Sequence, residues 1–190
     1  SRMGEHKFED FKISPQVLEN VRLKGYTTPT PIQDQIMHSV IEGRDAIGIA
    51  NTGTGKTAAF LIPLIEKISK NRFEKVLIIT PTRELALQVE EVIRKLGGPL
   101  GVRTAILIGG ESTYRQIQML RRNPQIVIGT PGRIIDHLEQ KNLSLRKVEI
   151  LVLDEADRML DMGFAPQLKR ILQVVPRERQ TLLFSATMPD

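Results

Sequence analysis

The sequence predicts an α/β fold, in which a mostly parallel central sheet has helices on both of its faces. Six short apolar stretches of strand length occur along the chain, and segments with the apolar spacing of helices separate them. This alternation is typical of βαβ units with right-handed crossovers, whose parallel sheets are covered on both faces. The pattern leaves the order of the strands in the sheet open.

The individual elements follow from these apolar patterns. Strands are expected at 45–50, 75–80, 103–108, 125–129, 148–153 and 180–184. Helices are expected at 56–69, 83–96, 112–121, 132–140 and 164–174. Two further helices should precede the first strand, because a polar residue followed by proline is a favoured helix start and occurs there twice, at Ser14-Pro15 and Thr30-Pro31.

Length and composition indicate one globular domain over residues 1–190. Residues 1–12 form a polar lead in which Ser1 and Arg2, ahead of Met3, resemble a cloning remnant. The chain contains no apolar run of membrane-spanning length and no signal-like start, so we expect a soluble, cytoplasmic and monomeric protein without membrane partners. It has no cysteine and only three histidines, which exclude disulfides and argue against a zinc cluster. Any metal should therefore be bound by oxygen atoms.

The charge balance is basic, with 27 basic and 22 acidic residues and a net charge of +5. A basic domain is suited to polyanions such as nucleic acid, although a solvated surface with a few excess lysines gives the same balance. Aromatic residues make up only 4% of the chain, and tryptophan is absent. Because base stacking needs aromatic side chains, contacts to a nucleic-acid backbone suit this chain better.

A glycine-rich loop follows the first expected strand, with the sequence ANTGTGKT at 50–57, and a helix is expected after it. Gly53 and Gly55 allow the backbone to wrap a phosphate, and the helix N-terminus adds a positive dipole. In such a loop Lys56 meets the β and γ phosphates of a nucleotide and the Thr57 hydroxyl binds Mg²⁺. Ala50 departs from the glycine that usually opens this pattern, and an incidental glycine-rich turn is the alternative interpretation.

An acidic tetrad follows the apolar strand expected at 148–153. Its four residues are Asp154, Glu155, Ala156 and Asp157, and three of them carry carboxylates. Ligands of α/β folds bind beyond the carboxyl ends of the strands, so this placement predicts a metal and water site. Asp154 is the expected acidic partner of the Mg²⁺ ion. The alternative is an ordinary acidic helix start.

With these motifs the chain resembles the DEAD-box family of ATP-dependent RNA helicases over essentially its whole length. It is similar to their first RecA-like domain, a P-loop domain. The residues that carry the resemblance are ANTGTGKT, DEAD, Phe8, GYTTPTPIQ at 25–33, PTRELALQ at 81–88, Gly109-Gly110, TPGR at 130–133 and SAT at 185–187. The family commonly has alanine at the position of Ala50.

The resemblance implies that ATP is the cofactor and that Gln33 holds its adenine base. The other implied contacts to the nucleotide are Tyr26 and Thr28, Phe8 packed nearby, and the loop residues Asn51, Thr52, Gly53, Thr54, Gly55, Lys56 and Thr57. The amide of Gln33 is suited to this role because its donor and acceptor match the N6 and N7 edge of adenine and not guanine. The same residue belongs to a capped helix start, and the two interpretations are compatible.

For hydrolysis, the resemblance implies that Asp154 holds Mg²⁺ through water and that Glu155 orients the attacking water, with Lys56 on the phosphates. The resemblance also implies that Asp157 bonds to Ser185 and Thr187 and so couples the hydrolytic site to the SAT element. Alternatively, these two hydroxyls only satisfy backbone groups at the end of a strand.

For RNA, the resemblance implies contacts to the backbone without base reading. The implied residues all follow expected strands: Pro81, Thr82, Arg83, Gly110, Thr130, Gly132 and Arg133. Arg83 could instead pair with Glu84 or another acid, and a similar alternative applies to Arg133.

The chain ends just after SAT, so the family's second RecA-like domain is missing from it. We therefore expect weak nucleotide binding and little RNA-stimulated turnover from this chain alone. Two rival functions remain open: a DNA-directed helicase or translocase, and a non-catalytic RNA clamp switched by ATP.

Overall fold

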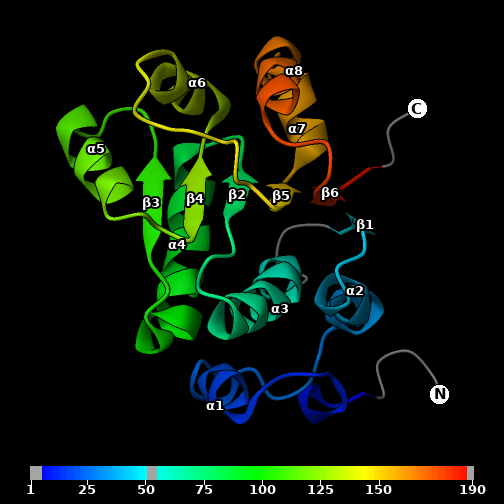
Figure 1. Ribbon diagram of the computed structural model, residues 1–190. Helices are drawn as coiled ribbons and strands as arrows, with labels where there is room; N and C mark the ends of the chain where they lie inside the picture. The colour runs from blue at the N-terminus through cyan, green and yellow to red at the C-terminus, as the bar shows by residue number, and fades with distance from the viewer. Residues whose placement is uncertain (1–5, 51–54, 188–190) are drawn as a thin grey trace.

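The computed structural model describes residues 6–50 and 55–187, and its six strands form one parallel sheet (Figure 1). The strands are β1 (Ala46–Ile49), β2 (Val76–Ile79), β3 (Thr104–Leu107), β4 (Ile126–Gly129), β5 (Ile150–Leu153) and β6 (Gln180–Ser185). Their order in the sheet is β1-β6-β5-β2-β4-β3, and every neighbouring pair is parallel. The predicted fold class is confirmed, and each observed strand lies within one or two residues of its predicted bounds.

Seven of the helices lie where the sequence predicts them, five from apolar spacing and two from a polar residue followed by proline. The helices are α1 (Pro15–Leu23), α2 (Pro31–Ile41), α3 (Lys56–Lys70), α4 (Arg83–Gly97), α5 (Thr113–Arg121), α6 (Pro131–Glu139), α7 (Ala156–Asp161) and α8 (Ala165–Val174). Two 3₁₀ turns, η1 (Phe8–Asp10) and η2 (Gly98–Leu100), and the short helix α7 were not among the predicted elements. The Thr30 hydroxyl accepts a hydrogen bond from the backbone of Gln33 and caps α2, whereas the Ser14 side chain makes no such bond to α1.

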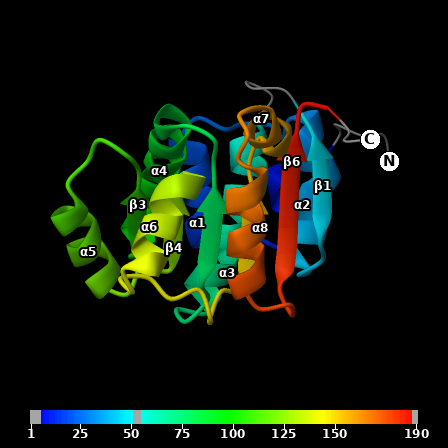
Figure 2. The same cartoon turned by 90° about the horizontal axis from the view of Figure 1, so that it is seen from above.

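Two hydrophobic clusters cover the two faces of the sheet. Val76 and Ile78 of β2 belong to the cluster that includes α1, α2, α3 and α4, while Leu77 and Ile79 belong to the cluster of α6, α7 and α8. The alternation follows from the period of two along a strand. Figure 2 shows α6 and α8 on one side of the strands and α1, α2 and α3 on the other. A sheet covered on both faces was predicted and is confirmed.

The strand order divides the carboxyl edge of the sheet into two halves. Because the strands are parallel, the segments that follow them all emerge at this one edge. The segments after β1, β6 and β5 are the glycine-rich loop, SAT and the acidic tetrad. The segments after β2, β4 and β3 hold PTREL, TPGR and Gly109-Gly110. The topology thus separates the residues implied for nucleotide from those implied for RNA.

Gly48 is the point of closest packing between β1 and β6, and it yields a prediction on stability. A Cβ at this position would lie 2.7 Å from Cδ1 of Phe184, whose ring packs on Phe60 with centroids 5.0 Å apart. Gly48→Ala should lower the free energy of unfolding by about 1–3 kcal/mol because the ring must shift in a packed core. Urea denaturation measures this difference.

Gly132→Ala is the matched control, since a Cβ there meets nothing within 4 Å. It lies in α6, where alanine is the better helix former, so its stability should be unchanged or higher by up to about 1 kcal/mol. Equal unfolding midpoints for the two variants would contradict the packing argument.

Candidate functional site

Three charged side chains meet at the ends of β1 and β5. Nζ of Lys56 lies 2.5 Å from Oδ1 of Asp154 and 3.2 Å from Oε2 of Glu155. Lys56 and Asp154 are only 5% and 1% exposed. They border a pocket of about 310 Å³, which is lined by Tyr26, Gly55, Lys56, Thr57, Ala58, Leu85, Gln88, Val89, Asp154 and Glu155. The structure thus brings together the lysine of the glycine-rich loop, Thr57 and the first two acids of the tetrad.

Gly55 positions Lys56 by starting α3 in a backbone conformation that favours glycine. Its φ of 83° is left-handed, and a Cβ would lie 2.8 Å from Oγ1 of Thr30 and 2.9 Å from Nε2 of Gln33. The first turn of α2 therefore rests directly on the start of α3. The predicted loop residues Asn51, Thr52, Gly53 and Thr54 lie outside the described residues.

Gln33 joins these two helix starts through its amide. Oε1 accepts a hydrogen bond from the backbone N–H of Thr30 at 2.9 Å, and Nε2 donates to the carbonyl oxygen of Gly55 at 3.2 Å. The side chain is fully buried. One N–H and one oxygen lone pair of the amide are left after these bonds. Contact with an adenine base through them stays a prediction.

The other residues expected near the base lie in different surroundings. Tyr26 lines the Lys56 pocket and also a second pocket that contains Phe8. Phe8 itself is buried in the hydrophobic core, and Thr28 is exposed. Burial raises the pKa of the Tyr26 hydroxyl, with the charge of Lys95 opposing the rise. Tyr26 is therefore the residue of this group that borders the charged cluster.

Asp154 and Glu155 differ in environment although they are adjacent. Burial raises the pKa of the Asp154 carboxyl, and the nearby Lys56 ammonium opposes that rise. Glu155 has a φ of 55°, uncommon for a residue with a side chain, and stands at the N-cap of α7. Such conformations are often found at functional sites, where surrounding structure maintains them. The helix start interpretation of the tetrad is thus correct, and it coexists with the charged pocket.

Asp157 faces the segment after β6. Its Oδ2 accepts hydrogen bonds from the backbone N–H of Ala186 and from the hydroxyl of Thr187, both at 3.2 Å. The Ser185 hydroxyl donates to the carbonyl oxygen of Thr187 at 2.6 Å. Desolvation would raise the pKa of Asp157, but bonds from Arg158, Ser185, Thr187 and Ala186 outweigh it and keep the pKa below its ordinary value. The structure therefore connects the tetrad to SAT across β5 and β6.

At the other half of the edge, Arg83 bridges to the segment after β3. Nη1 donates to the carbonyl oxygen of Gly109 at 3.2 Å, and Nη2 donates to Oε1 of Glu111 at 2.6 Å. Gly110 has a φ of 78°, and a Cβ there would lie 2.7 Å from Nη1 of Arg83. Glycine at this position lets the guanidinium lie close to the backbone. The acid that pairs with Arg83 is Glu111 and not Glu84.

The remaining residues implied for RNA surround this bridge. Arg133 donates from Nη1 to the hydroxyl of Thr113 at 3.0 Å. Thr82 caps α4 by accepting from the backbone N–H of Leu85 at 3.2 Å, and Pro81 is buried beside it. Thr130 precedes α6 without a side-chain cap bond, and Gly132 faces open space. The polar groups of Arg83 and Arg133 are thus held on neighbouring strand ends.

Some contacts were missed by sequence reasoning. Gln88 lines the Lys56 pocket and lies inside the PTRELALQ segment, but no role was assigned to it. Glu111 and Thr113 hold the two arginines and carry no sequence signal besides their place after β3. Within residues 6–50 and 55–187, no three His, Cys, Asp or Glu residues gather as a metal cluster. No helix there is long and apolar enough to cross a membrane.

Comparisons with known proteins match this chain to helicases. The family model described as DEAD/DEAH box helicase matches residues 30–190. ATP-dependent RNA helicase CshA of Listeria monocytogenes is 52% identical over 97% of this chain and 36% of its own length. ATP-dependent rRNA helicase RRP3 of Meyerozyma guilliermondii is 46% identical over 97% of this chain and 39% of its own length. The chain thus spans less than two fifths of these curated relatives.

A solved structure agrees with them. The crystal structure of a DEAD box protein from the hyperthermophile Methanococcus jannaschii superimposes with a TM-score of 0.91 at 42% identity. The match covers 96% of this chain and 50% of that one.

The bonds of Asp157 yield a prediction on pH dependence. Since its pKa is lowered in the folded chain, its stabilisation is present above the unfolded pKa, about 4, and is lost as the pH falls through the lower folded pKa. Asp157→Asn should therefore lower the urea midpoint at pH 7, and its difference from the parent should shrink below about pH 4. Asp161→Asn, at the exposed end of the same helix, is the control and should match the parent throughout. A difference that grows toward acid pH would contradict the assignment.

Proposed function

This chain belongs to the DEAD/DEAH box helicase family, and from that premise we propose that it is the ATP-binding RecA-like domain of an ATP-dependent RNA helicase. The observation that supports this most directly is the cluster of Lys56, Asp154 and Glu155 in one pocket at the carboxyl edge of a parallel sheet. A lysine and two acids at that place suit a nucleotide triphosphate and its metal ion.

In the proposed reaction, water attacks the γ-phosphorus of ATP and gives a proton to the Glu155 carboxylate, the bond to the bridging oxygen breaks, and ADP and phosphate leave. Phosphoryl transfer depends mostly on positioning and charge neutralisation, which Lys56 provides by binding the phosphates. Glu155 orients the attacking water, and its unusual backbone at the end of β5 directs it toward the same pocket as Lys56. Asp157 couples the site to the SAT segment through the hydrogen bonds it accepts from Ala186 and Thr187, and Ser185 is joined to them through its bond to the Thr187 carbonyl oxygen.

Mg²⁺ is the proposed metal, and the donor set suits it. The Thr57 hydroxyl and the Asp154 carboxylate line the same pocket and offer only oxygen. Mg²⁺ takes one or two carboxylates and completes its shell with water and nucleotide phosphates, so a protein cluster of three acids is not needed. When bound, the ion neutralises phosphate charge. Gln33, which already bonds Gly55, is proposed to link adenine recognition with the phosphate loop.

RNA is the proposed partner at the other half of the edge. Arg83, Gly110, Thr130, Gly132 and Arg133 are proposed to bind phosphates and 2′-hydroxyls along one strand, with Pro81 and Thr82 beside them. The adjacency of β2, β4 and β3 supports this, because it aligns three segments in a row. Turnover and unwinding are proposed to need a second RecA-like domain, consistent with relatives more than twice as long as this chain.

Glu155→Gln tests the hydrolytic role. In a protein that joins this domain to its second RecA-like domain, the variant should bind a fluorescent ATP analogue as the parent does. Its RNA-stimulated ATP turnover should fall about 10²–10⁴-fold, because the amide cannot accept a proton from water. Glu178→Gln, an exposed loop acid, is the control and should retain full turnover. Undiminished turnover in Glu155→Gln would remove the water-positioning role.

Arg83→Ala tests the RNA role. Binding of a single-stranded RNA should weaken, and the slope of log affinity against log salt should decrease by about one, since one phosphate contact is lost. Arg94→Ala removes a similar exposed ion pair, with Glu90, at the far end of the same helix and should change neither quantity. A matched DNA strand that stimulates turnover as well as RNA does would instead favour a DNA-directed helicase.

A further inference from the structure

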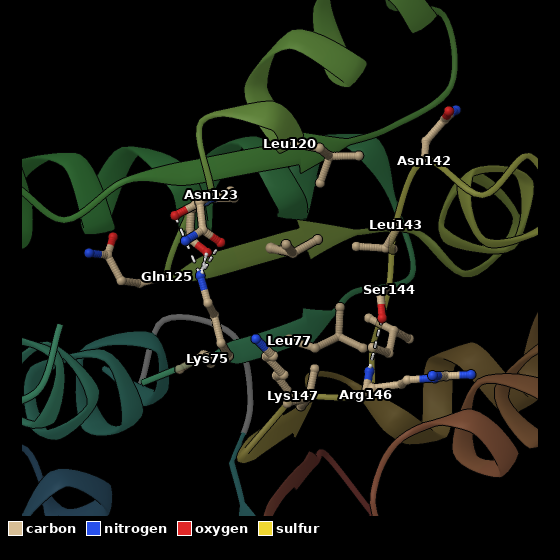
Figure 3. Close-up of a pocket in the computed structure, with 15 residues that line it drawn as sticks. Lys75, Leu77, Leu120, Asn123, Gln125, Asn142, Leu143, Ser144, Arg146 and Lys147 are labelled. Carbon is tan, nitrogen blue, oxygen red and sulfur yellow. Dashed lines mark hydrogen bonds between the residues drawn. The ribbon is translucent and has the colours of Figure 1, made fainter. Parts of the chain in front are cut away.

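We propose that the opposite end of the sheet carries a docking pocket for a partner-protein segment that combines acidic and apolar side chains. The pocket has a volume of about 360 Å³ and lies where β2 and β4 begin, beneath the segment that connects α6 to β5 (Figure 3). It shares no lining residue with the Lys56 pocket at the carboxyl edge. The two sites can therefore be occupied at the same time.

The floor of this pocket is apolar and incompletely covered. Val127 of β4 lines it together with Leu120 and Leu143, and all three are half-buried. β4 is an interior strand, and interior strands of parallel sheets are normally covered on both faces. Here an irregular segment crosses the sheet in place of a helix, as Figure 3 shows for the chain from Asn142 to Lys147. An inserted apolar side chain would remove this surface from water, which is favourable.

The rim of the pocket is basic. Among the residues that the structure describes, Lys75, Arg146 and Lys147 line it, and no aspartate or glutamate does. No ion pair involves these three side chains in the part of the chain that the structure describes. Nζ of Lys75 donates to neutral oxygens, which are Oδ1 of Asn123 at 2.7 Å and the carbonyl oxygens of Pro124 at 3.0 Å and of Asn123 at 3.4 Å.

Two of these side chains, Lys75 and Lys147, are also close enough to repel one another. Desolvation lowers the pKa of Lys75, and the charge of Lys147 lowers it further. A carboxylate bound at the rim would offset this repulsion, so the rim favours an anionic partner.

The combination of floor and rim favours a peptide over a nucleic acid. A phosphate backbone would match the charge but offers no apolar group for the floor. Bases bind single-strand sites by stacking on aromatic side chains, and no aromatic residue in the described part of the chain lines this pocket. An acidic peptide with Leu or Phe side chains satisfies both features at once.

The experiment uses NMR of the ¹⁵N-labelled chain titrated with a synthetic peptide of twelve residues, six of them Asp or Glu and three of them Leu or Phe. The expected result is a set of amide shifts concentrated at Val127, Leu143 and Lys147. A peptide with Ser in place of Leu and Phe should bind at least about tenfold more weakly, as should one with Lys in place of the acids. Equal binding by either altered peptide, or no shift at these residues, would overturn the proposal.

Charge-reversed variants localise the binding. Arg146→Glu with Lys147→Glu should weaken peptide binding at least about tenfold while circular dichroism is unchanged, because both side chains are exposed. Lys169→Glu with Arg177→Glu makes the same charge change at exposed positions outside the pocket and should stay within about twofold of the parent. Equal losses in the two double variants would indicate general charge attraction and overturn the site. Binding of a twelve-nucleotide oligouridylate at these residues in place of the peptide would overturn the choice of partner.

Discussion

The contact of Lys56 with Asp154 and Glu155 joins the two parts of the chain on which the candidate site depends. Lys56 begins α3 after β1, and the acids end β5, so 98 residues separate the lysine from Asp154 along the chain. Such a pair costs desolvation energy when it is buried, and removal of one partner from a buried pair commonly costs about 3–5 kcal/mol. Lys56 and Asp154 are both almost fully buried, so this arrangement is better explained by function than by stability.

The parallel sheet makes that contact possible and also determines what lies beside it. β6 lies between β1 and β5, and its end provides the Ala186 and Thr187 groups that bond Asp157. The tetrad is therefore connected on one side to Lys56, which follows the glycine-rich loop, and on the other to SAT. The first turn of α7 lies between Asp154 and the segment that follows β6, because Asp157 in that turn bonds Ala186 and Thr187. This chain of contacts is a physical basis for coupling between the two segments.

Much of the fold could be predicted from the sequence because local patterns determine it. Short apolar stretches located all six strands, the helical spacing of apolar residues located five helices, and the Ser14-Pro15 and Thr30-Pro31 starts located two more. The helix α7 was anticipated only as the alternative interpretation of the acidic tetrad, because its six residues are too few to show a period. The strand order was not predictable because the chain from β1 to β2 passes over β6 and β5, a choice made by non-local packing. Likewise, the bond from Gln33 to Gly55 depends on how closely α2 approaches α3.

The two ends of the sheet also differ in how much of their surface could be predicted from local sequence patterns. At the carboxyl edge, glycines, acids and capping residues follow the strands in recognisable motifs, so the sequence alone indicates the site. At the amino edge, the basic pocket is assembled from separate segments around β2, β4 and the approach to β5, none of which forms a motif. Lys75, Arg146 and Lys147 become a cluster only through the parallel register that aligns Val76 with both Ile126 and Ile150. A surface of this kind is visible only in the folded chain, and it lies at the end of the sheet opposite to the residues proposed to bind nucleotide and RNA.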